Sequence, residues 1–261
     1  MNGIPAKLQK RIDEGYDFRF GDYIGRGFSL MQKEIGLFIL GFILFLVLSG
    51  IASIVPILGG LISAVVVTPM IIVGFYYTGH KVDRGEKLEV ADFFKSFDRI
   101  GDLILTALLV FLVVFGALLP GLILAISSGV MAYVVDGDLS SINTTLVFSG
   151  ILLAAIPAIY FGVSYTWAYP LVWFYDLRPW QAMETSRKLI GKQWGIIFLF
   201  LLVVGILAGL GLVVLIVGIL FTAPAMYLAQ YAAFADVTGL LEDGVEGEEA
   251  ADIIDHFVPA E

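Results

Sequence analysis

The chain has 261 residues, of which 59% are hydrophobic and only 15% are charged, and its mean hydropathy is +0.93. A soluble domain carries about 25% charged residues. A water-soluble core of this size cannot hide the excess of apolar side chains, so lipid must solvate much of it. The sequence contains no cysteine, which excludes disulfides, thiolate catalysis and cysteine-ligated metals. These values indicate an integral membrane protein.

Six apolar stretches are long enough to cross a membrane. The hydrocarbon layer is about 30 Å thick and requires about 20 apolar residues per helix. The stretches cover residues 35–54, 57–79, 103–128, 144–175, 194–213 and 214–235. Backbone polar groups in lipid must bond within their own segment, so we expect an all-α integral membrane fold of six helices arranged as three hairpins.

The basic residues indicate how the chain is threaded. Every lysine and arginine lies before the first span, between the second and third, or between the fourth and fifth, and residues 135–145 on the opposite side have none. Positive residues are retained on the cytoplasmic side. The sequence therefore predicts a multi-pass protein of the bacterial inner membrane with both termini in the cytoplasm.

The two ends of the chain are polar. The first 20 residues lack the apolar core of a secretory signal, so nothing there indicates cleavage. From Asp236 onward the chain has nine acids and no lysine or arginine, which accounts for the net charge of −9. We expect a cytoplasmic N-terminal segment (1–34), a six-span membrane domain (35–235) and an acidic cytoplasmic tail (236–261).

A similar amphipathic segment precedes each odd-numbered span, at residues 18–34, 88–102 and 177–194. In the second segment, apolar residues recur at helical spacing between charged ones, which is typical of a helix lying flat in the headgroup region. The unit of one interfacial helix and two spans is therefore predicted to occur three times. The stretches SLMQKEIGLFIL and KLIGKQWGIIFL of the first and third units align without gaps.

Two prolines occupy matching places in the first and third units. Pro69 and Pro224 both fall in the middle of the second span of their unit. Broken helices carry substrate sites in many transporters that are built from repeats, but proline also simply kinks membrane helices. The two positions are candidate hinges or structural kinks. Gln230, one and a half turns beyond Pro224, is the candidate ligand-binding residue among the polar residues of the spans.

The fourth span is too long for a single crossing and carries an aromatic cluster at its end. As one helix, residues 144–175 would extend about 48 Å at 1.5 Å per residue, so Pro157 and Pro170 are expected to divide or bend it. The cluster comprises Tyr165, Trp167, Tyr169, Trp173 and Tyr175. These residues either form an aromatic belt at the inner interface or line a pocket for a lipid headgroup or another ligand.

Catalytic and metal-binding motifs are missing from the sequence. The two histidines, His80 and His256, have no second metal ligand near them in sequence, and no HExxH, GxSxG or phosphate-binding loop is present. The spans contain no ionisable residue between their ends, which argues against ion-coupled transport. Gly205 and Gly209 form a GxxxG step, which favours helix packing inside the chain over dimerisation. We expect no cofactor and no nucleic-acid partner.

Residues 177–194, followed by an apolar hairpin with a mid-span proline and then by YLAQYAAFADV, resemble an uncharacterised bacterial six-span inner-membrane family. This family is similar to the membrane domain attached to some glycerophosphodiester phosphodiesterases. The stretches LPGLILAISS and YPLVWFYD also fit, and the likeness covers roughly residues 18 to 238. The resemblance implies an integral membrane helical fold, no established activity and no catalytic residue.

Two functional hypotheses follow. Uncharged spans, small loops and the absence of a catalytic motif favour a non-enzymatic accessory or scaffold subunit of a membrane assembly. Its acidic tail, residues 242–261, is either a docking segment for a basic protein partner or a solvated extension. The alternative is a transporter or lipid-handling protein, which the repeated unit, the two prolines and the aromatic cluster favour. Membrane lipids are expected partners under both hypotheses.

Overall fold

The structure, a computed structural model, describes residues 4–54, 58–130, 134, 137, 142–213 and 217–241. The regular structure of these residues is entirely helical: 86% helix, with no strand among them. The elements in chain order are α1 (Ala6–Glu14), α2 (Phe20–Lys33), α3 (Ile35–Ser53), α4 (Leu58–Ile62), η1 (Ser63–Val67), α5 (Thr68–Asp83), η2 (Val90–Arg99), α6 (Ile100–Ala125), η3 (Ile126–Val130), α8 (Thr144–Ser164), α9 (Ala168–Tyr175), α10 (Pro179–Gly191), α11 (Trp194–Val213) and α12 (Ile219–Thr238). The predicted docking segment, 242–261, lies outside the described residues.

Five helical stretches of the described chain are long and apolar enough to cross a membrane. They are Ile35–Ser53, Leu58–Asp83, Val90–Ser128, Thr144–Tyr175 and Trp194–Leu212, and they correspond to the first five predicted spans. The predicted all-helical fold is thereby confirmed, and these five stretches are compatible with a membrane protein. The sixth predicted span, 214–235, falls mainly on α12, which is not among the five. Polar residues such as Gln230 and Asp236 interrupt its apolar sequence.

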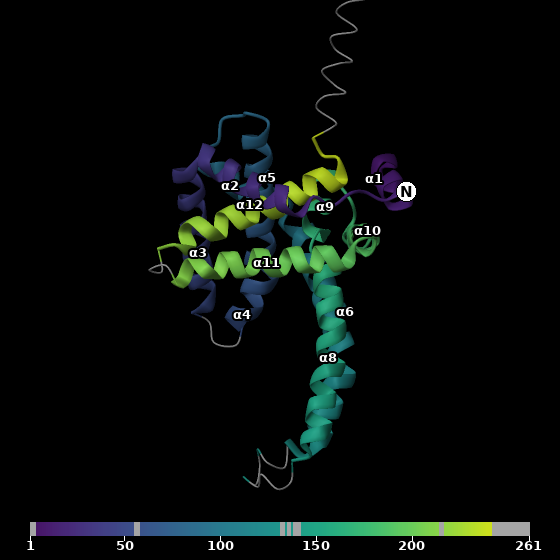
Figure 1. The fold of residues 1–261 in the computed structure, drawn as a ribbon. Helices are drawn as coiled ribbons and strands as arrows, with labels where there is room; N and C mark the ends of the chain where they lie inside the picture. The colour runs from purple at the N-terminus through teal and green to yellow at the C-terminus, as the bar shows by residue number, and fades with distance from the viewer. Residues whose placement is uncertain are drawn as a thin grey trace, which may run out of the picture.

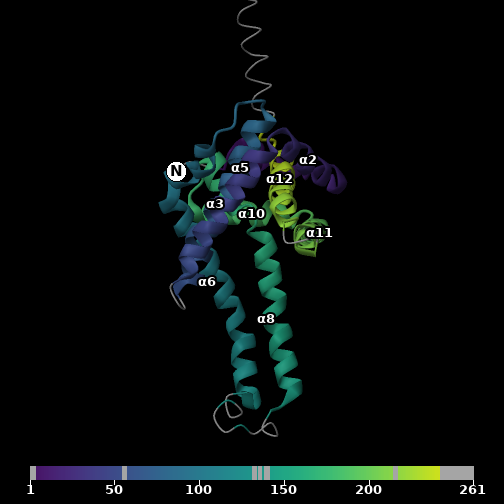
Figure 2. The same cartoon turned by 90° about the vertical axis from the view of Figure 1, so that its left-hand side faces the viewer.

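The long helices run in two directions (Figures 1 and 2). Two helical hairpins, α3 with α4–α5 and α6 with α8, run up and down in Figure 1, and the α6–α8 pair extends far below the rest. Helices α11 and α12 pack side by side and run across the upper part of the molecule. The helices that carry lysine and arginine, among them α1, α2 and α10, gather around this upper part.

Helix α12 is the centre of the core. Its residues Ala225, Leu228, Ala229, Ala232 and Phe234 have no exposed surface. Small side chains allow neighbouring helices to approach closely, and α2 lies directly along the alanine-rich face of α12. A Cβ added at Gly27 of α2 would lie only 2.5 Å from the Ala225 carbonyl oxygen. The segment predicted as the first interfacial helix therefore packs closely on α12.

The second amphipathic segment, η2, also packs on the protein. Phe93 is completely buried, and its ring lies 5.9 Å from that of Phe38 on α3 and 5.4 Å from that of Phe75 on α5. Lys95 and Asp98 are exposed on the other side of the helix. The predicted helical amphipathicity is present, but the central residue of its apolar face is covered by protein.

The proline positions have local structural explanations. The π-helix η1 ends at Val67, two residues before Pro69, and the backbone N–H and the hydroxyl of Thr68 both donate to the Ser63 carbonyl, the hydroxyl at 3.0 Å. This wider turn fits the missing N–H of Pro69. Pro157 lies inside an unbroken α8, and Pro170 lies inside α9. The fourth span instead breaks between them, at residues 165–167.

A hydroxyl on α10 secures this break. The Trp167 backbone N–H donates to Ser186 Oγ at 3.2 Å, and Ser186 Oγ donates to the Ser164 carbonyl at 2.7 Å. Ser186 thereby satisfies one backbone donor and one backbone acceptor that the interrupted helix leaves without a helical partner. The break in the fourth span is therefore stabilised by a contact with α10, and neither predicted proline lies at it.

Candidate ligand cavity

A cavity of about 600 Å³ lies between the crosswise α11–α12 pair and the two other hairpins. Its lining residues are Phe42, Ile72, Val110, Gly162, Tyr165, Thr166, Tyr169, Leu201, Val204, Gly205, Ala208, Ile219, Ala223, Met226, Tyr227 and Gln230. Ligand pockets in proteins typically have volumes of roughly 300–1,000 Å³. Every one of the five long apolar stretches contributes at least one of these residues.

The lining follows helical periodicity, so whole helix faces form the walls. On α11 the lining residues are Leu201, Val204, Gly205 and Ala208, at positions i, i+3, i+4 and i+7. On the chain through α8 and α9, residues 162, 165, 166 and 169 repeat the same spacing. Side chains three and four residues apart share one face of a helix. The α11 wall is therefore one face of a regular helix, whereas the second wall passes from α8 through the break at residues 165–167 into α9.

The polar groups of the cavity are hydroxyls and one amide. Tyr165, Tyr169 and Tyr227 contribute phenolic hydroxyls that form no hydrogen bond to another described residue. Thr166 Oγ1 donates to the Gly162 carbonyl at 3.2 Å, and Gln230 Nε2 donates to the Met226 carbonyl at 3.4 Å. Because the Gln230 bond is long, its amide can exchange this partner for a better one. The cavity thus offers donors and acceptors to a ligand inside an apolar wall.

None of the lining residues is charged. Arg187 and Glu184 of α10 both act electrostatically on Tyr165, but with opposite signs. Arg187 donates two hydrogen bonds to the Glu184 carboxylate, at 2.9 and 2.7 Å. This contact, with Lys188 3.7 Å away, holds the pKa of Glu184 below its ordinary value. The pair largely neutralises itself, so it contributes little net charge at the cavity.

The structure brings together three of the residues named from the sequence. Tyr165, Tyr169 and Gln230 line the same cavity although up to 65 positions separate them in the chain. Of the cluster's three tyrosines, Tyr165 and Tyr169 line the cavity and Tyr175 does not.

The other named residues lie elsewhere. Trp167 is buried against Phe234, with ring centroids 6.2 Å apart, and Trp173 contacts Tyr77 at 5.8 Å. Pro69 and Pro224 are buried in their helices and do not line the cavity.

Several lining residues were missed by sequence reasoning. Tyr227 lies one turn before Gln230, on the same face of α12, and its helical spacing could have identified it. The α11 face is apolar and carries no local marker. Gly205 lines the cavity, and a Cβ added at Gly205 or Gly209 would meet no atom within 4 Å. The predicted packing of the GxxxG step inside the chain is therefore not seen among the described residues.

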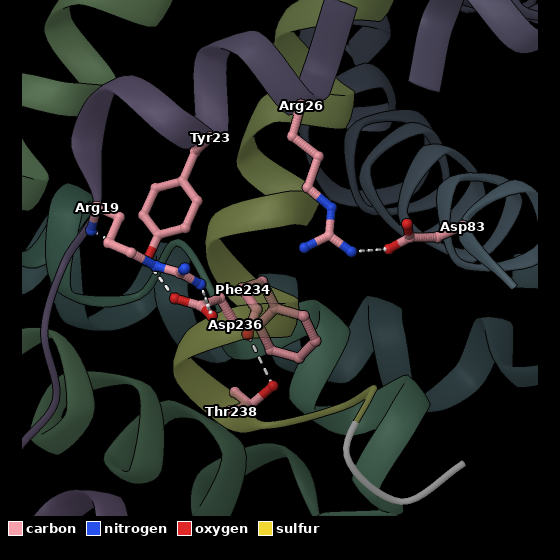
Figure 3. Close-up of polar contacts among 7 residues, drawn as sticks. All are labelled: Arg19, Tyr23, Arg26, Asp83, Phe234, Asp236 and Thr238. Carbon is pink, nitrogen blue, oxygen red and sulfur yellow. Dashed lines mark hydrogen bonds and ion pairs between the residues drawn. The ribbon is translucent and has the colours of Figure 1, made fainter. Parts of the chain in front are cut away.

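A polar network lies on α2, α5 and the end of α12, next to this site (Figure 3). Arg19 forms an ion pair with Asp236, and the Tyr23 hydroxyl donates to the same carboxylate at 2.5 Å. Arg26 donates to Asp83 Oδ2 at 2.6 Å. These contacts fix α2 to both α12 and α5.

The network continues along α12. Tyr231 donates to Asp83 Oδ2 at 3.1 Å, and its hydroxyl lies 3.2 Å from His80 Nδ1. Tyr231 directly follows Gln230, so the network holds the same turn of α12 that lines the cavity. His80 is thus part of a hydrogen-bonded pair. The described residues contain no group of three or more histidine or acidic side chains that could hold a metal ion.

Comparisons with protein-family models, curated proteins and solved structures found no match. The resemblance of residues 18–238 to a bacterial inner-membrane family therefore stays a prediction.

Proposed function

We propose that this chain is a lipid-handling membrane protein that holds an amphipathic membrane molecule in the cavity beneath α11 and α12. The observation that carries the proposal is that all five long apolar stretches line one cavity of about 600 Å³. A cavity lined by helices that cross a membrane would face the hydrocarbon layer, whose main component is lipid. The proposal assigns no chemical step, since the lining offers only hydroxyl and amide groups.

We further propose that the protein spans the bacterial inner membrane with the ends of its chain on the cytoplasmic side. The support is that all 15 lysines and arginines lie before residue 35, between residues 79 and 103, or between residues 175 and 194, which are the segments that precede the first, third and fifth predicted spans. In this orientation α1, α2 and α10 lie at the inner surface. A reporter fused near Gly137 should then face away from the cytoplasm, and a cytoplasmic signal there would contradict the orientation.

A second candidate is the accessory or scaffold subunit that the sequence favours. The observation that supports it is the α6–α8 hairpin, whose outward side chains make little contact with the rest of the described chain. Leu112 and Phe148 are 67% and 68% exposed. Exposed apolar surface of this kind is covered either by lipid or by another membrane helix. A protein partner that co-purifies in mild detergent, and is lost when Leu112 and Phe148 are made polar, would favour this candidate.

Gly205 and Gly209 of α11 provide the test of the lipid proposal. Gly205→Leu adds a side chain at the cavity wall, whereas Gly209→Leu adds the same side chain one turn away, at a position that does not itself line the cavity. Both changes improve helix propensity by a similar amount. Native mass spectrometry of the purified protein should detect bound lipid in the parent and the Gly209 variant. We expect at least about a fivefold loss in the Gly205 variant, an order-of-magnitude figure for blocked pocket contacts. Equal lipid binding in all three would exclude the cavity as the lipid site.

A further inference from the structure

The polar groups of the cavity also bear on which lipid it accepts. We propose that it selects a lipid whose polar group is uncharged and carries carbonyl or ester oxygens, in preference to a phospholipid. This inference rests on the proposed lipid-handling function and adds the chemical class of the ligand. Its starting point is that all the lining residues are uncharged.

The hydrogen-bonding groups favour an acceptor-rich ligand. The hydroxyls of Tyr165, Tyr169 and Tyr227 are directed to no other described residue, so each can donate one hydrogen bond. The Gln230 amide, held only by a 3.4 Å contact within its own helix, supplies further donors and one acceptor oxygen. Ester, ketone and quinone oxygens accept such bonds without carrying a charge.

A phosphate group does not fit this lining. A buried anion needs a compensating cation or several strong donors, because transfer of an unpaired charge out of water is very unfavourable. Arg187 acts electrostatically on Tyr165, but its guanidinium is engaged by Glu184 at 2.9 and 2.7 Å. Arg26, which does not line the cavity, is likewise paired with Asp83 (Figure 3). A phospholipid would therefore have to keep its headgroup outside the cavity.

The aromatic walls are consistent with a planar or ester-containing polar group. The Tyr165 ring stacks on Phe161 with centroids 5.6 Å apart, and Tyr227 stacks on Phe75 at 5.1 Å. These contacts fix both rings, so their hydroxyls are pre-positioned and lose little conformational freedom when a ligand binds. Two kinds of membrane molecule share the required chemistry: acylglycerols, through ester carbonyls, and isoprenoid quinones, through ring carbonyls.

The experiment compares lipids that differ in the charge of the polar group. The full chain in mild detergent is titrated with dioleoylglycerol, with dioleoyl phosphatidylglycerol and with an isoprenoid quinone, and occupancy is measured by native mass spectrometry. We expect one of the two uncharged lipids to bind at least about tenfold more tightly than the phospholipid. Tighter binding of dioleoylglycerol would identify an acylglycerol as the ligand, and tighter binding of the quinone would identify an isoprenoid quinone.

Variants separate this inference from the proposed function. Tyr169→Phe and Gln230→Leu remove polar atoms with little change of volume, and each should weaken the uncharged lipid by about three- to tenfold while leaving phospholipid binding unchanged. Gly205→Leu should abolish binding of the uncharged lipid, and Gly209→Leu should not. If phosphatidylglycerol binds as tightly and is displaced by Gly205→Leu, the ligand class is wrong although the cavity is a lipid site. The ligand class is also wrong if Arg187→Gln weakens the binding of phosphatidylglycerol. If Gly205→Leu affects no lipid, the proposed function itself fails.

Discussion

The α6–α8 hairpin and helix α12 are both apolar, but the hairpin is mostly exposed and α12 is mostly buried inside the protein. The stretches containing α6 and α8 have mean hydropathies of 2.8 and 2.2, yet only 6% and 11% of their most apolar windows are buried inside the protein. Helix α12 is not apolar enough to rank among the five, but most of its residues from Ala223 onward are buried. Hydropathy therefore indicates which segments lipid can solvate, and it does not indicate which segment forms the core.

The two regions are held together by different contacts. Helices α6 and α8 touch through small residues, and a Cβ added at Gly121 would lie 2.5 Å from the Gly150 carbonyl oxygen. Helix α12 packs against α2, α3, α5 and α11, and ion pairs on its α2 side add direction to that packing. A substitution in the α6–α8 hairpin should therefore have little effect on the structure of the rest of the protein. A substitution in α12 should affect both the cavity and the packing of α2.

The largest contrast is expected between two phenylalanines. Phe93→Ala removes a completely buried ring between α3 and α5, and should lower the free energy of unfolding by about 3–5 kcal/mol. Phe148→Ala removes a ring that is 68% exposed on α8, and should change it by no more than about 0.5 kcal/mol. Thermal melting of both variants in the same detergent measures the difference. Equal losses would mean that α8 is packed against protein.

A smaller effect is expected at the contact of α2 with α12. Gly27→Leu would force α2 away from the Ala225 carbonyl, and we expect a loss of about 1–3 kcal/mol, the usual range for overpacking. Gly25→Leu in the same helix meets no atom within 4 Å and is the matched control. The melting temperatures of the two variants should differ clearly. If both melt like the parent, α2 does not pack on α12 as closely as the structure has it.

The polar network should contribute about 1–3 kcal/mol, because its central carboxylate is largely buried. Asp83 is 10% exposed and accepts hydrogen bonds from Arg26 and Tyr231, so Asp83→Asn weakens two contacts at once. Asp98 is 63% exposed and 3.6 Å from Lys95, so Asp98→Asn should be nearly neutral. Chemical or thermal unfolding of the two asparagine variants compares them directly. A similar loss of stability in both variants would indicate that removing a negative charge destabilises the protein irrespective of the polar network.

Much of the fold could be predicted because hydropathy is a local property. The bounds of the first and fifth apolar stretches, Ile35–Ser53 and Trp194–Leu212, agree with prediction to within one residue. Burial of Phe93 and the crosswise course of α12 depend on contacts between distant segments, which no local pattern encodes. In the cavity, Gln230 was named from the sequence because a polar residue in an apolar stretch is conspicuous, and Tyr165 and Tyr169 were named as part of an aromatic cluster, for which a pocket was one of two interpretations. The glycine and aliphatic residues of α11 could not be predicted as cavity residues, because residues that face lipid are of the same types.

The smallest expected effect is the pH dependence of the Arg187–Glu184 pair beside the cavity. The hydrogen bonds from Arg187 hold the folded-state pKa of Glu184 below its ordinary value of 4.5. The pair therefore stabilises the protein above that value, and the stabilisation is lost as the pH falls through the lower folded-state pKa. The Glu184 side chain is 35% exposed, so solvent screens the interaction and the effect is small. Melting temperature recorded from pH 6 down to about pH 3 should fall less steeply for Glu184→Gln than for the parent. Arg187→Gln should flatten the same part of the curve, since it removes the group that lowers the pKa. Parallel curves for the parent and both variants would show that the pair contributes nothing to acid stability.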